Sequence, residues 1–367
     1  MAHVSQHRTA IVLQGGGALG AYQASTICAL ANAEVWPDIV AGISIGAINA
    51  ALVAGNPPAR RAERLRAFWD RVTSATAWPG TSAFGAAFAA MAGVPGFFAP
   101  RIPPAALAIA DSPQSAGIYD TGPLRATLEE LVDFDLLNAG PTRFVVGAVN
   151  VASGNFIWFD SAERRIGPEH IMASGALPPG FPPVEIDGQF YWDGGLVSNT
   201  PLSRIFETRT DTAPLVIWQV DLFSARGPVP SSVWQIEARE KDIRFSSRTR
   251  AITDQLHSEH KIADALKLHE AALPDDLKAH PAIAPLLANA TRGPVTLIHL
   301  IYRAKPYEAG AKDYDFSRDA MRLHWSAGEA DVVTSLADPR LDAHDADTDG
   351  MHVFDLTDAA PQERLSP

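Results

Sequence analysis

Short and almost fully apolar runs, separated by longer amphipathic segments, make up the pattern of this chain. Four runs are rich in Val, Ile and Leu, and they lie at residues 9–13, 39–41, 215–220 and 295–302. Runs without polar alternation are typical of parallel strands that are buried on both faces. Because segments with helical spacing follow several of them, we expect strands that alternate with helices around a buried sheet.

Other elements follow from the same pattern. Residues 143–149 and 155–159 are predicted as two strands joined by a turn at 152–154, and residues 190–192 as a further strand. The helical spacing predicts a helix that follows the stretch 14–23 and reaches about residue 32, and further helices at residues 60–71, 124–137, 169–174, 233–273 and 315–336.

One turn carries most of the candidate chemistry, because a short β-branched run ends in Gly-x-Ser-x-Gly over residues 42–46 and an alanine-rich helical pattern follows at once. A strand, a sharp turn and a helix are the context of a nucleophile elbow. Gly42 and Gly46 lack a Cβ, which lets neighbouring chain pack closely against a strained turn. Ser44 is therefore the candidate nucleophile, at a helix N-terminus whose amides favour negative charge.

The first apolar strand leads into a glycine loop with Gly15, Gly16, Gly17 and Gly20. Backbone amides at such a helix start form an anion-binding nest. The spacing also matches the dinucleotide fingerprint G-x-G-x-x-G, which expects an acidic residue after the second strand. Asp38 precedes that strand instead. Amides that stabilise an oxyanion in acyl transfer therefore account better for this loop, and nucleotide binding stays the alternative.

A serine hydroxyl needs a base within hydrogen-bond reach before it attacks a substrate. The predicted strand at 190–192 leads into Asp193-Gly194-Gly195, where the acid can serve as that base. An Asp-Gly pair is also a common turn signal. The histidines are scattered, and none lies in a glycine-rich loop at a strand end. We therefore expect Ser44 to act with a carboxylate, Asp193, in place of histidine.

Two sequence patterns suggest a metal, and neither is favoured. His257 and His260 are three residues apart, as on one helix face, but no clustered third ligand is evident. Residues 345–350 imitate the start of a calcium loop, yet Leu356 stands where the bidentate Glu is required. We expect neither a metal nor a cofactor, and a solvated acidic turn at 345–350.

Composition limits the partners of this chain. Its 367 residues carry a formal net charge of −12, with a pI of about 5.3. This charge argues against nucleic acid and against electrostatic attachment to anionic lipid, so a lipid would have to be met by apolar contact. The single Cys28 excludes an internal disulfide, and residues 1–10 lack the apolar region of a signal peptide. We expect a cytoplasmic protein, with peripheral membrane contact left open.

Residues 72–100 contain no charged side chain, and their second half, 83–98, is strongly apolar. Several Gly and Pro residues interrupt the stretch, so a continuous membrane-spanning helix is not available. A buried helical hairpin is our expectation. A mobile apolar lid or an acyl-chain channel is the functional alternative.

Three ordered blocks of the sequence resemble the patatin-like phospholipases. The blocks are the loop Gly15-Gly16-Gly17-x-x-Gly20, the elbow Gly42-Ile43-Ser44-Ile45-Gly46, and Asp193-Gly194-Gly195 followed by Asn199 and Pro201. Residues 173–183 also resemble the segment ahead of that family's Asp-Gly motif, and the whole resemblance covers residues 9–223. It implies a three-layer α/β/α fold with a mainly parallel central sheet, a Ser-Asp dyad without histidine, and hydrolysis of acyl esters in lipids.

Position by position, the resemblance makes Ser44 the nucleophile, Asp193 the base and Gly15, Gly16 and Gly17 the oxyanion loop. Leu19 stands where many members carry Arg or Lys, just before the last glycine of the loop. A cation there would add electrostatic support near the loop. Its absence affects the expected preference for phosphate head groups more than it affects the expected acyl chemistry.

The predicted organisation has three parts. Residues 1–225 form the catalytic domain, residues 226–340 a mostly helical region packed on it, and residues 341–367 an acidic tail. The second part resembles an accessory C-terminal region of some bacterial members. The expected function is hydrolysis of lipid esters, and a thioesterase or an intracellular polyhydroxyalkanoate depolymerase with the same dyad is the alternative. A nucleotide-binding protein and a non-catalytic lipid-binding scaffold are the alternatives from other classes.

Overall fold

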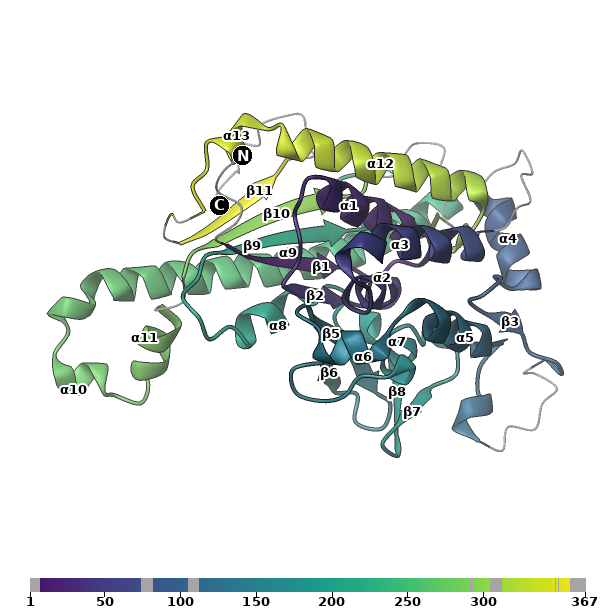
Figure 1. Cartoon of the computed structure of the whole chain (residues 1–367), viewed down its shortest axis with the longest axis horizontal. Coiled ribbons are helices and arrows are strands. Elements are labelled where there is room, and N and C mark those ends of the chain that lie inside the picture. Colours follow the sequence, from purple (N-terminus) through teal and green to yellow (C-terminus); the bar gives the residue numbers. More distant parts are fainter. Residues whose placement is uncertain are drawn as a thin grey trace.

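The structure is a computed structural model that describes residues 7–73, 82–104, 112–290, 293–303, 312–346, 348 and 350–356. Within these residues, nine strands form one mixed sheet in the order β11-β10-β9-β1-β2-β5-β8-β7, with β6 paired to β5 (Figure 1). Their bounds are β1 (Arg8–Leu13), β2 (Ile39–Gly42), β5 (Arg143–Asn150), β6 (Phe156–Asp160), β7 (Val184–Ile186), β8 (Gln189–Asp193), β9 (Leu215–Asp221), β10 (Val295–Ile301) and β11 (Met351–Asp355). The strands from β11 to β5 run parallel, and β6, β7 and β8 are antiparallel to their neighbours.

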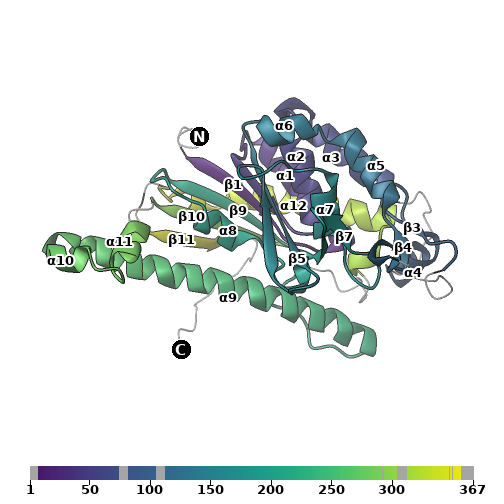
Figure 2. The same ribbon diagram turned by 90° about the horizontal axis from the view of Figure 1, so that it is seen from below.

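Helices cover both faces of this sheet, which gives the predicted three-layer α/β/α fold (Figures 1 and 2). One face carries α1 (Gly20–Asn32), α2 (Ile45–Ala54), α3 (Pro58–Val72) and α12 (Arg318–Leu336), and the other carries α8 (Leu202–Glu207) and α9 (Val233–His269). The remaining helices are α4 (Ser82–Ala92), α5 (Gly122–Leu131), α6 (Phe134–Ala139), α7 (Pro168–Ser174), α10 (Asp275–Lys278), α11 (Ala284–Ala290) and α13 (Pro339–Asp342).

The position of β1 between two layers of helices explains why its sequence is apolar without alternation. Ile11 and Leu13 belong to the larger core, on the side of α1, α2, α3 and α12, whereas Ala10 and Val12 belong to the smaller core, on the side of α8 and α9. All four side chains are fully buried. Because successive side chains point to opposite faces, a strand between two helical layers needs an apolar residue at every position.

Two expectations on local structure are corrected. The predicted helix at 124–137 is two helices, α5 and α6, because Val132 is extended and Asp133 caps α6 by accepting the amides of Asp135 at 3.0 Å and Leu136 at 2.9 Å. A capping carboxylate satisfies the free amides of a new helix start, which favours a break at that point.

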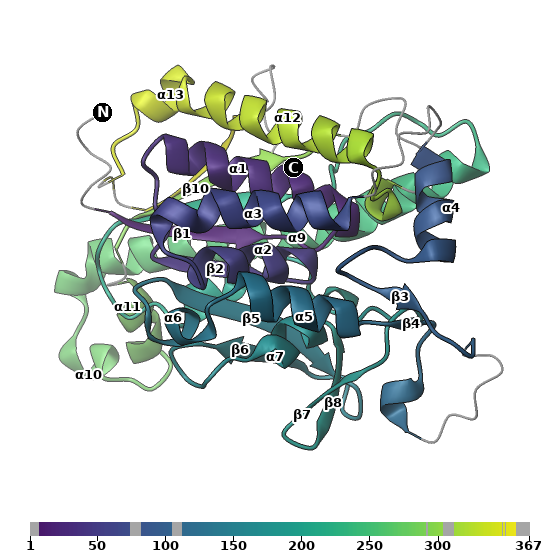
Figure 3. The ribbon, with the colours of Figure 1, turned by 45° about the vertical axis from the view of Figure 1, so that its right-hand side comes forward.

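The second correction concerns residues 72–100, of which 74–81 lie outside the described residues. The described part is not a buried helical hairpin but a single helix, α4, followed by a tight turn and by β3 (Ala99–Pro100), which pairs with β4 (Tyr119–Asp120) (Figure 3). Gly93 and Gly96 turn the chain with φ of 78° and 69°, a left-handed conformation that glycine adopts without strain. On α4, Phe88 is 49% and Met91 81% exposed.

The C-terminal part of the chain continues the same sheet. Strand β10, which was predicted as a strand, pairs with β9, and β11 then adds an edge strand. The segment expected as an acidic tail therefore contains a strand at 351–355, whose Met351 joins the smaller core. Helix α9 is 37 residues long and runs beneath the sheet, with α10 and α11 near its C-terminal end (Figure 2).

Two further findings apply to the described residues only. No helix among them combines the length and apolar character needed to cross a membrane. No group of three or more His, Cys, Asp or Glu side chains among them is arranged to hold a metal ion.

Candidate active site

The predicted elbow lies between β2 and α2. Ser44 has φ 55° and ψ −121°, a left-handed conformation that costs free energy in any residue except glycine. A Cβ on Gly42 would lie 2.2 Å from the Gly46 carbonyl oxygen, and a Cβ on Gly46 would lie 2.5 Å from the carbonyl oxygen of Leu13. Only glycine fits at both positions, so the turn holds Ser44 at the N-terminus of α2 in one backbone geometry.

Pairing along β5 brings Asp193 to this turn. Gly42, the last residue of β2, pairs with Val146, and Asp193, the last residue of β8, pairs with Ala148. The ends of both strands thus lie two residues apart along β5, although they are about 150 positions apart in the sequence. The Ser44 hydroxyl lies close enough to the Asp193 carboxyl to lower its pKa.

Two glycines after Asp193 allow the close packing of this junction. A Cβ on Gly194 would lie 2.6 Å from the Gly147 carbonyl oxygen, and a Cβ on Gly195 would lie 2.8 Å from Oδ1 of Asn199. Both belong to the short 3-10 helix η5 (Gly194–Leu196), which Asp193 caps. The contact at Gly194 is with backbone, so a side chain there would displace this junction, whereas the contact at Gly195 is with a side chain.

The carboxyl group of Asp193 has an unusual environment. It is 3% exposed, and its Oδ1 accepts the Gly195 amide at 2.7 Å. Burial raises its pKa to about 7, although the Gly195 amide and the Ser44 hydroxyl lower it. No lysine or arginine of the described residues pairs with it. A carboxyl that titrates near neutral pH can both accept and return a proton.

A residue without a role in the sequence analysis supports the elbow from behind. The backbone amide of Ser44 donates to Oγ of Ser174 at 3.0 Å, and Ser174 is fully buried at the end of α7. The only sequence signal for this contact is the resemblance of residues 173–183 to a family segment. The contact fixes the Ser44 backbone from a helix 130 positions away in the sequence.

The glycine loop lies directly against Ser44, because a Cβ on Gly15 would be 3.1 Å from the Ser44 Cβ. The Gly15 amide already donates to the Asn199 carbonyl at 3.1 Å, and Asn199 Nδ2 donates back to the Gly15 carbonyl at 2.8 Å. Within the described residues, the amides of Gly16 and Gly17 donate to no acceptor. The Gly15 amide is therefore engaged, and within the predicted oxyanion loop the amides of Gly16 and Gly17 stay available for a ligand.

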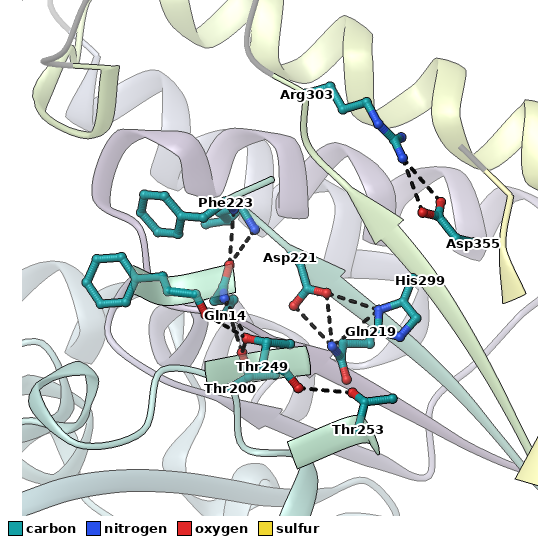
Figure 4. A network of polar contacts seen from close by, with 12 residues as sticks. Gln14, Thr200, Gln219, Asp221, Phe223, Thr249, Thr253, His299, Arg303 and Asp355 are labelled. Carbon is teal, nitrogen blue, oxygen red and sulfur yellow. Dashed lines mark hydrogen bonds and ion pairs between the residues drawn. The ribbon is translucent and has the colours of Figure 1, made fainter. Parts of the chain in front are cut away.

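Sequence reasoning also missed the residue that precedes this loop. Oε1 of Gln14 accepts the amides of Leu222 at 2.6 Å and Phe223 at 3.2 Å, and its Nε2 donates to Thr200 at 3.2 Å and Thr249 at 3.0 Å (Figure 4). A fully buried amide with all these partners fixes the start of the glycine loop.

His299 pairs with an aspartate of this sheet, and its partner is Asp221 and not Asp193. Nδ1 of His299 lies 3.1 Å from Oδ2 of Asp221, where β10 and β9 run side by side (Figure 4). The Gln219 amide donates to the same carboxylate at 2.9 Å. This network therefore satisfies Asp221, while Asp193 accepts the Gly195 amide and lies beside the Ser44 hydroxyl.

Comparison with known proteins decides the family. Residues 11–205 match the family model described as patatin-like phospholipase. The chain belongs to the patatin-like phospholipase family. Residues 243–347 of this patatin-like phospholipase match a second model, described as patatin phospholipase. The resemblance seen in the sequence is confirmed, and family membership makes the protein an ester-bond hydrolase whose family acts on lipid esters.

Comparisons with solved structures and with curated protein sequences add no further assignment. VipD from Legionella pneumophila is among the solved structures that match this patatin-like phospholipase, with 12% sequence identity and a TM-score of 0.34, over 88% of this chain and 67% of that one. No curated protein sequence matches the chain.

Proposed function

We propose that this patatin-like phospholipase hydrolyses carboxylic esters of lipids with Ser44 as the nucleophile and Asp193 as the general base. The observation that carries the proposal is the juxtaposition that β5 creates: the Ser44 hydroxyl lies beside a buried carboxyl whose pKa is raised to about 7. An ordinary aspartate, with a pKa of about 3.9, is a much weaker base for a serine hydroxyl. Burial without a cation brings the basicity of Asp193 close to the value that general-base catalysis needs.

The proposed reaction has two steps. Ser44 Oγ attacks the ester carbonyl while its proton passes to Asp193, and the carbonyl electron pair becomes an oxyanion that the amides of Gly16 and Gly17 stabilise. The intermediate collapses, the bond to the alcohol breaks, and Asp193 returns the proton to the leaving oxygen. Water then attacks the acyl-enzyme with Asp193 again as base, which releases the fatty acid and restores Ser44. The mechanism uses no metal and no cofactor.

Two contacts argue against the nucleotide-binding alternative. Asp38, the acid that would have to hold a ribose, accepts the Thr9 amide at 2.8 Å and thereby joins β1 to the start of β2. A Cβ on Gly17 would lie 2.2 Å from the Asp313 carbonyl oxygen, so this side of the loop faces protein. A clear calorimetric signal with NAD would nevertheless count against the hydrolase proposal.

For the lipid we propose apolar contact, in keeping with the net charge of −12. Leu196 and Val197 follow the proposed base closely and are 40% and 47% exposed. Substituting both with the uncharged Ser should reduce sedimentation with neutral phosphatidylcholine vesicles and leave hydrolysis of a soluble short-chain ester close to wild type. A cytoplasmic location with peripheral membrane contact stays a prediction.

A fluorophosphonate probe tests the proposed nucleophile. We expect the wild-type chain to be labelled and the Ser44→Ala variant to show no labelling, because the probe phosphonylates an activated serine. Equal labelling of Ser44→Ala would remove the assignment and leave the lipid-binding scaffold as the better account. A panel of phospholipids, neutral esters, acyl thioesters and polyhydroxyalkanoate then separates lipid-ester hydrolysis from the thioesterase and depolymerase alternatives.

A further inference from the structure

A short 3-10 helix from the C-terminal region lies on the glycine loop. In this helix, η7 (Lys312–Tyr314), the Asp313 carbonyl oxygen lies 2.2 Å from the position that a Cβ on Gly17 would occupy. Gly17 has a φ of 56°, so its conformation depends on glycine as well as on this neighbour. Tyr314 lies close enough to the site for the charge of Asp193 to contribute to its raised pKa, although burial is the main cause.

Two ion pairs tie η7 to α9, the long helix on the far face of the sheet. Nζ of Lys241 lies 2.9 Å from Asp313, and Nζ of Lys312 lies 2.7 Å from Asp242. Each helix thus supplies one lysine and one aspartate at consecutive positions, and the two pairs hold η7 against α9. Lys312 is only 5% exposed, so its charge depends on Asp242 for compensation.

Helix α9 also holds the other end of the glycine loop. Its Thr249 accepts a hydrogen bond from Gln14, whose carbonyl precedes Gly15, and Thr249 is 5% exposed (Figure 4). The loop is therefore fixed at its start by a hydrogen bond to α9 and at Gly17 by a helix that is ion-paired to α9. Both contacts come from beyond residue 225, outside the predicted catalytic domain.

We propose that Lys241 and Lys312 are positioning residues, which hold η7 against Gly17 and so keep the amides of Gly16 and Gly17 aimed at the oxyanion. The inference rests on the oxyanion role proposed above and gives residues 226–340 a part in catalysis. Oxyanion donors act best when they are fixed before the reaction, since no free energy is then lost in orienting them.

The test compares charge removal at the ion pairs with charge removal elsewhere on α9. In Lys312→Met and Lys241→Met we expect kcat on a soluble short-chain ester to fall about 10- to 100-fold with KM nearly unchanged, because misplaced donors weaken the transition state more than substrate binding. Arg244→Met is the matched control, since Arg244 pairs with Glu240 on the exposed side of the same helix. We expect its kcat to stay within twofold of wild type.

Conservative variants separate positioning from folding. Lys241→Arg keeps the charge and should retain most of kcat, whereas Asp313→Asn keeps the backbone and the side-chain size and should resemble Lys241→Met. Thermal unfolding confirms that each variant is folded, and the two variants at the more exposed pair remain measurable if Lys312→Met does not fold. Wild-type kcat in folded Lys241→Met and Asp313→Asn would overturn the inference, even with Ser44 established as nucleophile. Labelling of Ser44→Ala would instead overturn the proposed function.

Discussion

Two buried aspartates on strands that pair with β5 have opposite chemistry. Asp160 ends β6, opposite Val145, and Asp193 ends β8, opposite Ala148. Both are almost fully buried, at 0% and 3% exposure. Burial alone would raise the pKa of each, because it disfavours the charged form.

The partners of the two carboxyls make the difference. The Asp160 carboxylate accepts two hydrogen bonds from Arg143, one from Nε at 2.9 Å and one from Nη2. It accepts a third from Nη2 of Arg204 at 3.3 Å. Burial raises the pKa of Asp160, but the hydrogen bonds of Arg143 and Ala162 and the charges of both arginines bring it below its ordinary value. Asp193 pairs with no cation among the described residues; it accepts the Gly195 amide beside the Ser44 hydroxyl, and its pKa rises to about 7. One carboxyl is thus a fixed anion, and the other can exchange a proton.

The largest expected effect of breaking this contrast is on catalysis. Asp193→Asn removes the proposed base while keeping the shape of the side chain, so kcat should fall by about 10²- to 10⁴-fold. Steady-state hydrolysis of a soluble ester measures this loss. Asp160→Asn is the matched control, and its folded fraction should keep kcat close to wild type. A fully active Asp193→Asn variant would remove the dyad from the account.

The second largest expected effect is a loss in the free energy of unfolding when Asp160 is replaced. Asp160→Asn takes the carboxylate partner from Arg143, while Arg204 keeps its pairs with Glu163 and Glu207. Breaking a buried pair in this way costs about 3 to 5 kcal/mol. We expect the free energy of unfolding from urea denaturation to fall by that order at pH 8. An unchanged midpoint would show that the arginines do not depend on Asp160.

A smaller and opposite effect on stability is expected at Asp193. Its folded pKa of about 7 lies above the unfolded value of about 3.9, so its contribution to stability is fully present below pH 4 and is lost as the pH rises through 7. Asp193→Asn has no charge to bury and should be more stable than wild type by about 2 to 4 kcal/mol at pH 8. The difference should shrink toward pH 4. Urea denaturation at the two pH values measures it, and a gain independent of pH would contradict the cause given.

The sequence predicted the elements that local patterns determine. Ser44 and its flanking glycines could be placed because a strand, a turn and a helix follow one another within about fifteen residues. Asp193 could be proposed as the base because its own Asp-Gly-Gly turn is local as well. The apolar runs also predicted β9 and β10 as strands of a buried sheet.

The parts that could not be predicted depend on contacts between distant positions. Ser174 contacts the Ser44 amide across 130 positions, and Gln14 contacts Thr249 across 235. Lys312 reads as an ordinary charged residue in the sequence, yet it is buried beside Asp242. Strand β11 was missed because its five residues, in an acidic segment, gain their apolar surroundings only by pairing with β10.

The pH dependence of fluorophosphonate labelling tests the central claim most directly, since it reports the state of the base that activates Ser44. The account predicts that the labelling rate constant of the wild-type chain rises about tenfold per pH unit below pH 7 and levels off above it, because Asp193 must be ionised to accept the proton. A rate constant that is unchanged from pH 5 to pH 9 would contradict the assignment of Asp193 as the base.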